Sequence, residues 1–166
     1  MGLRPPAPLA AEHHLEEFDC GDETLNLWLQ RYALRNQQAG AARTFVVTDD
    51  AQRVVGFYSL AAGSVDHVVA TVRAAKGLSR HPIPVMVLAR LAVDRRFQSK
   101  GIGRGLLRDA VLRTLSVSEH AGIRALLVHA KNESAQRFYA HHGFEPSPID
   151  PLIMMLLLKD ARKALE

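Results

Sequence analysis

The chain has 166 residues, which is enough for one compact domain and too few for two ordinary ones. Apolar residues make up 48% and charged residues 23%, a usage typical of globular proteins that excludes disordered and fibrous classes. A single cysteine, Cys20, excludes an intramolecular disulfide framework. The longest apolar run, residues 152–158, is far shorter than the roughly 20 residues of a membrane span, and early prolines interrupt any apolar leader. These features predict a reduced, soluble, cytoplasmic protein.

The net charge of +4 is unevenly distributed along the chain. Residues 1–60 hold five Lys/Arg and eight Asp/Glu, a net charge of −3, whereas residues 61–166 hold sixteen and nine, a net charge of +7. Between Arg90 and Arg113, seven basic side chains accompany only two acidic ones. Such an excess attracts the phosphates of a cofactor or a nucleic acid, although a helix with a solvated basic face has the same composition.

The first half of the chain has the pattern of a helix followed by a β-hairpin. Asp22 is suited to be the N-cap of a helix that reaches about residue 38, where Gly40 stops it. One apolar face of this helix has the spacing i, i+3, i+4, i+7 and consists of Leu25, Trp28, Leu29 and Tyr32. Residues 44–48 and 54–60 are rich in Val, Phe and Tyr, and residues 49–53 between them predict a turn.

The second half alternates strands and helices. We expect strands at residues 85–93, 125–130 and 152–158, and helices at residues 101–119 and 132–142. Because antiparallel strands come first and a β-α-β-α-β half follows, the pattern predicts an α/β fold of mixed α+β type with helices on the faces of a mixed sheet. The intervening stretch gives only weak signals.

A glycine-bearing loop, residues 98–103, joins a predicted strand to the next helix. This arrangement directs backbone N–H groups and the positive end of a helix dipole toward one point, which is suited to an anion. Gly101 and Gly103 allow a close approach to a pyrophosphate, and Lys100 and Arg104 add charge. The third glycine of a dinucleotide fingerprint and the Gly-Lys-Ser/Thr of a P-loop are absent. A purely structural turn explains the glycines but not their basic neighbours.

The loop resembles the Q/R-x-x-G-x-G/A loop of the GCN5-related N-acetyltransferase (GNAT) family, with Gln98, Gly101 and Gly103 at the matching positions. In that family the loop binds the pyrophosphate of acetyl-CoA, and residues 130–135 and 138–144 resemble the strand-to-helix element that follows. The resemblance covers roughly residues 9–159 and implies a mixed, mostly antiparallel twisted sheet of about six to seven strands flanked by about four helices.

This resemblance implies acetyl-CoA as the cosubstrate, with no metal. The implied cofactor-binding residues are Leu91, Ala92, Val93, Gln98, Ser99, Lys100, Gly101, Ile102, Gly103, Arg104 and Asn132. By analogy with the family, Tyr139 places its hydroxyl near the cofactor sulfur and acts as the general acid. The alternative is that Tyr139 only completes an apolar helical stripe with Ala135 and Phe138. The domain boundaries that we expect are a Pro-rich lead-in at residues 1–8, one GNAT domain at 9–160 and a tail at 161–166.

A narrower resemblance concerns the N-terminal half. Residues 18–21, 25–29, 43–47 and 56–60 resemble the acetyltransferase toxins of bacterial type II toxin–antitoxin systems. That family acetylates the α-amino group of aminoacyl-tRNA and so blocks translation. The resemblance therefore implies aminoacyl-tRNA as substrate, a ribbon-helix-helix antitoxin as partner, a homodimer, and no membrane association.

The chemistry of the acceptor agrees with this substrate. An α-amine with a pKa of about 7.7–8.0 is roughly 10–15% neutral at pH 7, whereas a lysine with a pKa near 10.4 is about 0.04% neutral. No general base stands out, and the eight histidines lack metal-ligand spacing. Candidates for phosphate contacts with RNA, chosen by charge alone, are Arg73, Lys76, Arg80, Arg90 and Arg95. Alternatives are an acetyltransferase for a small-molecule or protein amine and, more remotely, a non-catalytic RNA- or nucleotide-binding module.

Overall fold

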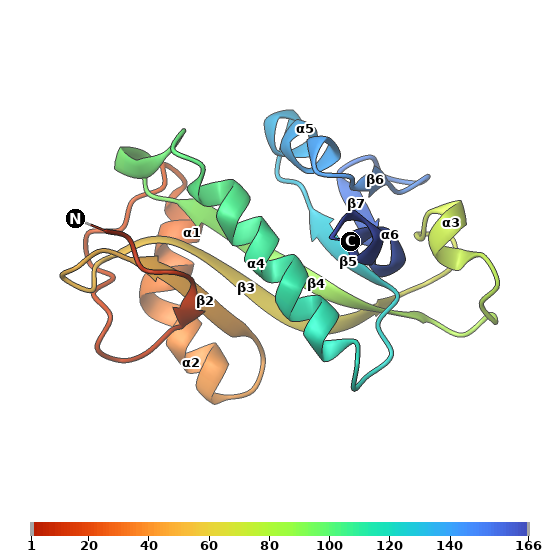
Figure 1. Ribbon diagram of the computed structural model, residues 1–166, viewed down its shortest axis with the longest axis horizontal. Helices are drawn as coiled ribbons and strands as arrows, with labels where there is room; N and C mark the ends of the chain where they lie inside the picture. Colours follow the sequence, from red (N-terminus) through yellow and green to blue (C-terminus); the bar gives the residue numbers. More distant parts are fainter. Residues whose placement is uncertain (1, 166) are drawn as a thin grey trace. The chain divides into compact units, whose positions relative to one another are not determined.

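The computed structural model describes residues 2–165. Seven strands form one sheet in the order β1-β2-β3-β4-β5-β7-β6 (Figure 1). Their bounds are Ala7–Pro8 (β1), Arg43–Thr48 (β2), Val54–Val65 (β3), Ile83–Val93 (β4), Ala125–His129 (β5), Glu145–Pro146 (β6) and Ile153–Leu157 (β7). β4 and β5 are parallel, whereas β1–β2, β2–β3, β5–β7 and β6–β7 are antiparallel. The predicted fold class, a mixed and mostly antiparallel sheet, is confirmed.

The described chain contains two compact units. The first unit consists of residues 2–61 and 89–110, and the second unit consists of residues 62–88 and 111–165. Two strands and one long helix contribute residues to both units: β3, β4 and α4 (Ile102–Val117).

The helix predicted after Asp22 is interrupted by a π-helical turn. It consists of α1 (Glu23–Leu27), the π-helical segment Trp28–Tyr32 and α2 (Ala33–Gln38), and the Asp22 carboxylate accepts N–H groups of its first turn. Ala33 is fully buried, whereas Tyr32 is 45% exposed. The prediction that Tyr32 continues the apolar face is therefore wrong, because a π turn adds a residue and rotates the following side chains away from a 3.6-residue period.

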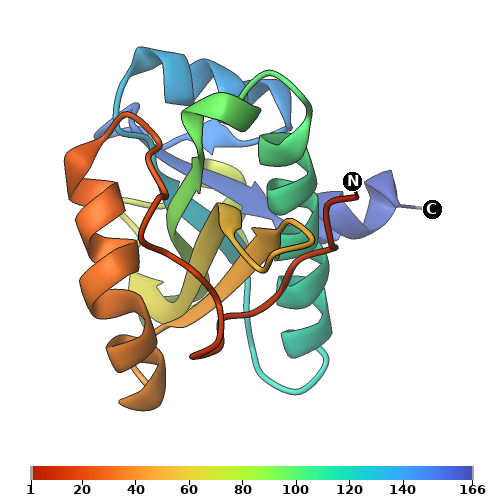
Figure 2. The ribbon, with the colours of Figure 1, turned by 90° about the vertical axis from the view of Figure 1, so that its left-hand side faces the viewer.

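In the first unit, β2 and β3 form the predicted hairpin and carry helices on both faces. On one face, Val46 and Phe57 pack against Leu29 of the π-helical segment. On the other face, a Cβ on Gly56 would lie 3.1 Å from Leu106 and 3.2 Å from Ile102, both on α4. Helices α1 and α2 and the first turns of α4 therefore cover opposite sides of this hairpin (Figure 2).

In the second unit, the stretch whose sequence signals are weak contains a short helix. This helix, α3 (Val72–Ala75), packs through Ala74 against Val85 of β4 and Leu127 of β5. The guanidinium of Arg124 donates hydrogen bonds to the carbonyls of residues 73, 74 and 76, which satisfies the C-terminal end of the helix.

The remaining helices agree with the sequence patterns except at the C-terminus. α4 buries Leu106, Ala110 and Thr114, which recur at every fourth position along the helix, and α5 (Glu133–His141) follows β5. The strand expected at residues 152–158 ends at Leu157, and Leu158–Ala164 forms α6, a helix in place of most of the expected tail. Its buried Leu158 and Ala161 have the i, i+3 spacing of a short amphipathic helix.

The Pro-rich lead-in also differs from the expectation at its end, where Ala7 and Pro8 pair with β2 as strand β1. Proline is tolerated at such an edge position. Within residues 2–165, no helix combines the length and the apolar character that a bilayer crossing requires.

Candidate functional site

The glycine-bearing loop follows the end of strand β4, beyond the part of the strand that pairs with β5. The parallel pairing of β4 with β5 runs from Val85↔Ala125 to Leu88↔Val128, and β4 then continues to Val93. A 3-10 turn, Arg95–Phe97, leads from this end into the loop. The candidate cofactor strand, residues 91–93, and the candidate phosphate loop are therefore adjacent parts of the first unit.

The loop has the backbone conformation of an anion cradle. Ser99 and Gly101 adopt positive φ values of +64° and +84°, and the first helical bond of α4 joins the Gly105 N–H to the Gly101 carbonyl at 3.1 Å. The N–H groups of the preceding helical residues therefore have no intrahelical acceptor and are available to a ligand. The positive end of the helix dipole lies at the same place.

At Gly103 the protein itself leaves room for a side chain. Its φ lies outside the left-handed region, and an added Cβ would meet only the Cγ2 atom of Val93, at an ordinary contact distance of 3.8 Å. The chain alone would thus accept alanine. A backbone kept bare at a helix N-terminus fits the close approach of a pyrophosphate.

Two positive side chains lie beside this cradle. Arg104 folds back over the loop, so that its Nη2 atom lies 3.9 Å from the Cβ position of Gly101. Lys100 places its Nζ atom 5.5 Å from the centre of the Phe97 ring. Both side chains are exposed, and neither forms an ion pair within residues 2–165. The residues present therefore fit the diphosphate of acetyl-CoA in charge and in hydrogen-bond donors.

Gln98 holds the loop in place with its side chain. Its amide nitrogen donates to the carbonyl of Val93 at 2.9 Å and to the carbonyl of Cys20 at 3.2 Å. The predicted cofactor-binding residue Gln98 therefore uses its amide to connect the loop to β4 and to the segment before α1. Its contact with the cofactor stays a prediction.

Asp94 is a buried anchor that the sequence reasoning missed. It is 1% exposed, and its carboxylate accepts from the backbone N–H groups of Asp19 (3.1 Å) and Arg96 (2.9 Å) and from the Arg96 guanidinium. Burial opposes ionisation, but these hydrogen bonds outweigh it and lower the pKa of Asp94. The available signal was a lone carboxylate directly after a strand in a strongly basic stretch.

A surface ion pair adds a second connection at the same place. The Arg95 guanidinium lies 2.7 Å from the Asp19 carboxylate, and the Arg95 N–H donates to the Asp19 carbonyl at 2.8 Å. This arginine, together with hydrogen bonds from Gly21 and Asn26, lowers the pKa of Asp19 to about 2. The base of the loop is thus fixed to the residues that precede α1.

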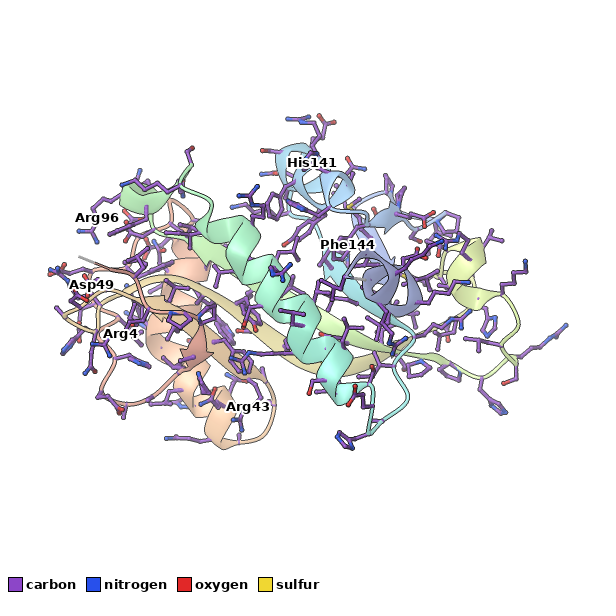
Figure 3. The ribbon with its side chains drawn as sticks, viewed as in Figure 1. Arg4, Arg43, Asp49, Arg96, His141 and Phe144 are labelled. Carbon is purple, nitrogen blue, oxygen red and sulfur yellow. The ribbon has the colours of Figure 1, made fainter. Side chains whose placement is uncertain are left out.

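In the second unit, the candidate residues lie on α5. Asn132 is its N-cap, where the side-chain oxygen accepts the Ala135 N–H at 2.9 Å. Tyr139 is 8% exposed, and burial raises the pKa of its hydroxyl to about 12. The hydroxyl forms no hydrogen bond with any residue of the range 2–165. His141 is exposed near the end of the helix (Figure 3). The buried Phe144 ring packs edge-to-face on Tyr139.

The five candidate RNA contacts have different surroundings. Arg73 forms ion pairs with Glu145 (2.7 Å) and Asp160 (2.8 Å), and Arg95 pairs with Asp19 as described. Lys76 and Arg80 are exposed. Arg90 lies half-buried against an aromatic ring in the first unit. Within residues 2–165, no group of three or more His, Cys, Asp or Glu side chains is arranged to hold a metal ion.

The fold and the loop geometry are those of an acetyltransferase. A family model described as an acetyltransferase (GNAT) domain matches residues 40–146, which is more than half of the chain. The chain therefore belongs to the GNAT family, and the family predicted from the sequence is confirmed.

Similarity to particular members extends over nearly the whole chain. The chain is 45% identical over 161 residues to a tRNA-acetylating toxin of Mycobacterium tuberculosis, covering 97% of this chain and 96% of the relative. It is 26% identical over 159 residues to a probable toxin TacT of Sinorhizobium fredii, covering 90% and 88% of the two chains.

Two solved structures extend this similarity to bound ligands. One is AtaT complexed with acetyl-methionyl-tRNAfMet, which matches with a TM-score of 0.91 at 28% identity and covers 99% of this chain and all of the other. The second is AtaTR bound with acetyl-CoA, with a TM-score of 0.85 at 29% identity, covering 99% of this chain and 98% of the other.

Proposed function

We propose that this protein is an acetyl-CoA-dependent toxin that acetylates the α-amino group of aminoacyl-tRNA and thereby blocks translation. The observation that carries the proposal is the 45% identity with a tRNA-acetylating toxin over 97% of the chain. An identity of this extent includes the phosphate loop, the β4 end and α5, so the similarity is not confined to the cofactor motif.

The first unit would bind the cosubstrate. N–H groups at the start of α4, with Lys100 and Arg104 beside them, are matched to the diphosphate. Gly103 leaves the backbone open for its approach. By the family resemblance, backbone groups of residues 91–93 would pair with the pantetheine arm. In the second unit, Asn132 is the predicted cofactor contact. Acetyl-CoA supplies the activated acetyl group when bound.

Tyr139 would hold and deliver the proton that the departing thiolate requires. Because burial raises the pKa of its hydroxyl to about 12, the phenol stays protonated throughout the pH range in which an α-amine becomes neutral. Its hydroxyl has no competing partner in the described chain, which leaves it available to a ligand. General-acid assistance of this kind contributes typically 10²–10⁴-fold to a rate.

The α-amine of an aminoacyl ester needs little help from a base. Its neutral fraction at pH 7 exceeds that of a lysine side chain by more than about 10²-fold, as the reference pKa values require. An enzyme without a dedicated base therefore favours an α-amino acceptor. The net charge of +7 in residues 61–166 favours an acceptor attached to a polyanion.

The remaining parts of the proposal follow from the family resemblance of the sequence. We infer one GNAT domain over residues 9–160, a cytoplasmic location, a homodimer and no metal requirement. An antitoxin is the expected protein partner, since a solved structure of a similar chain contains AtaT bound to the C-terminus of the antitoxin AtaR. Its ribbon-helix-helix type is expected from the family resemblance alone. An acetyltransferase for a small or protein amine is the alternative function.

Transfer of labelled acetyl groups tests the proposal. Purified protein with labelled acetyl-CoA should label aminoacylated tRNA and should leave the same tRNA unlabelled after its amino acid is removed. Free amino acids and a lysine-rich protein serve as competing acceptors in parallel reactions. Equal labelling of free amino acids would replace the tRNA substrate with a small amine, and labelling of the lysine-rich protein would favour a protein acceptor.

A further inference from the structure

Arg90 carries a partly buried charge that has no acidic partner. It lies half-buried on β4, and its guanidinium forms no hydrogen bond or ion pair with any residue from 2 to 165. The neighbouring Arg95 and Arg96, by contrast, each pair with a carboxylate. Burial lowers the pKa of Arg90, which is the direction expected for a charge that loses water without gaining a partner. A guanidinium in this state is matched to an anionic ligand.

This guanidinium is held in place by an aromatic ring. Its Cζ atom lies 4.0 Å from the centre of the Trp28 ring, and Trp28 itself is nearly parallel to Phe57, with 13° between the planes and 6.1 Å between the ring centres. This cation–π contact holds the guanidinium against the ring without using its N–H donors. Those donors remain available around its edge.

Arg90 lies on the face of β4 opposite to the phosphate loop. Val93 turns toward the loop, since its Cγ2 atom is the atom nearest to the Cβ position of Gly103. Ala92 turns the other way and packs in the core that contains Leu29 of the π-helical segment. Arg90 shares the face of Ala92, as the alternation of a strand requires and its contact with that segment confirms. An anion bound by Arg90 is therefore distinct from the diphosphate expected at the loop.

The segment that contains Trp28, residues 24–48, has a basic composition and an irregular helix. Trp28 begins the π-helical segment, in which its carbonyl accepts the Ala33 N–H, and such turns occur frequently at functional sites. Residues 24–48 contain three arginines and no Asp or Glu. Two of these arginines lie exposed on the helix, and the third, Arg43, begins β2 (Figure 3). This part of the first unit attracts a polyanion, although residues 1–60 as a whole have a negative net charge.

We propose that Arg90 and Trp28 form an acceptor subsite for the single-stranded 3′ end of the tRNA. The guanidinium would take two oxygens of a backbone phosphate, and the indole that lies against it would hold it in position. A phosphate contact does not depend on base identity, so the subsite suits a terminal sequence that different tRNAs share. The inference rests on the proposed function, because it assigns part of the acceptor that the reaction uses.

Single-turnover kinetics at varied aminoacyl-tRNA concentration test the subsite. Arg90→Gln should raise the half-saturating tRNA concentration about tenfold while the maximal rate stays within about twofold, since the change removes a substrate contact and no reacting group. The slope of log affinity against log salt should become less steep by about 1. Arg90→Lys keeps the charge but loses the planar guanidinium, and an increase of about threefold is expected. Trp28→Phe should weaken binding less than Arg90→Gln.

Three controls separate this role from other causes. Arg108→Gln removes an equally positive but exposed side chain on α4, and it should change the half-saturating concentration less than twofold. Melting temperature shows whether each variant folds, and calorimetry with acetyl-CoA shows whether the cofactor site is intact. If Arg90→Gln does not fold, the half-saturating tRNA concentrations of Arg90→Lys and Arg108→Lys are compared instead. Only Arg90→Lys should then show an increase.

The outcomes are distinguishable. An unchanged half-saturating tRNA concentration in Arg90→Gln would overturn the subsite, as would an equal loss in Arg108→Gln. A weaker affinity for acetyl-CoA would assign the guanidinium to the cofactor instead. If the wild-type protein transfers no label to any aminoacyl-tRNA, the proposed function itself is wrong and the subsite falls with it.

Discussion

Tyr139 is the residue whose hydroxyl can be removed with the least structural disturbance. The ring is buried between neighbours on α5 and the following turn, while the hydroxyl forms no hydrogen bond within residues 2–165. Tyr139→Phe therefore leaves no polar group unsatisfied, and the free energy of unfolding should change by less than about 0.5 kcal/mol. Acetyl-CoA should bind with unchanged affinity, whereas the transfer rate should fall roughly 10²-fold or more because the proton donor is lost.

Tyr58→Phe is the matched control, because it should have the opposite effects. The Tyr58 hydroxyl donates to Asp109 at 2.5 Å in the core of the first unit. Removing it leaves a carboxylate with one donor fewer, so thermal stability should fall while the rate per folded molecule is kept. Full transfer activity in Tyr139→Phe, measured by single-turnover labelling, would show that Tyr139 is not the proton donor and only packs in the core.

At the scale of elements, the loop between β4 and α4 can be tested at two glycines. Gly103→Val places a branched side chain where only Val93 is near, so the chain should still fold, but the side chain would occupy the space expected for the diphosphate. Acetyl-CoA affinity should fall at least about tenfold by calorimetry. Gly105→Ala is the control, because a Cβ added at this helical position would have no atom within 4 Å. This variant should keep its affinity for acetyl-CoA, and its free energy of unfolding should rise by about 0.5–1 kcal/mol.

An unchanged affinity for acetyl-CoA in a folded Gly103→Val protein would remove the loop from the cofactor site. A comparable loss of acetyl-CoA affinity in Gly105→Ala would show that any substitution in this turn of α4 distorts the site, since a Cβ at Gly105 would have no atom within 4 Å.

The base of the same loop depends on the ionisation of Asp94. The pKa of Asp94 is lower in the folded protein than its ordinary value of 3.8, so its ionised form stabilises the fold above that pH. This stabilisation is lost as the pH falls through the folded-state pKa. Asp94→Asn should therefore lower stability by about 1–3 kcal/mol at pH 7, because one buried acceptor no longer bears a charge beside Arg96.

Thermal melts at a series of pH values check this prediction. The difference between Asp94→Asn and the wild-type protein should shrink below pH 3.8, where the wild-type carboxyl is increasingly protonated. Glu119→Gln, at an exposed position, is the control and should show little difference at any pH. A difference that stays constant from pH 7 to pH 3 would mean that the charge of Asp94 is not what stabilises the loop.

At the scale of the whole molecule, an uneven charge distribution should govern the encounter with tRNA. Several phosphate contacts would release counterions, so the half-saturating concentration of aminoacyl-tRNA should rise steeply as salt is added. Expression of the wild-type chain should arrest bacterial growth, and expression of Tyr139→Phe at the same level should not. Transfer that is indifferent to salt, or arrest that is equal for both chains, would contradict a catalytic toxin acting on tRNA.

Much of this protein follows from local patterns in the sequence. The hairpin of β2 and β3, the helix cap at Asp22 and the buried stripe of α4 are local properties, because turn chemistry, capping and periodicity act over a few residues. The phosphate loop could also be predicted, since the glycines and their basic neighbours are consecutive in the sequence. The C-terminal helix α6 was missed because its apolar residues continue directly from those of a buried strand.

Other features depend on residues that are distant in the sequence. The hydrogen bonds that join Asp94 and Gln98 to residues 19–20 connect positions more than 70 residues apart, so no local pattern predicts them. The π-helical turn begins at Trp28, whose ring packs against Phe57 and the guanidinium of Arg90, two residues that lie far from it in the sequence. The sequence by itself determined the family and the position of the glycine-bearing loop between a strand and a helix. Only the tertiary structure decided which charged side chains are satisfied by the protein and which are left for a ligand, because that depends on partners brought together by folding.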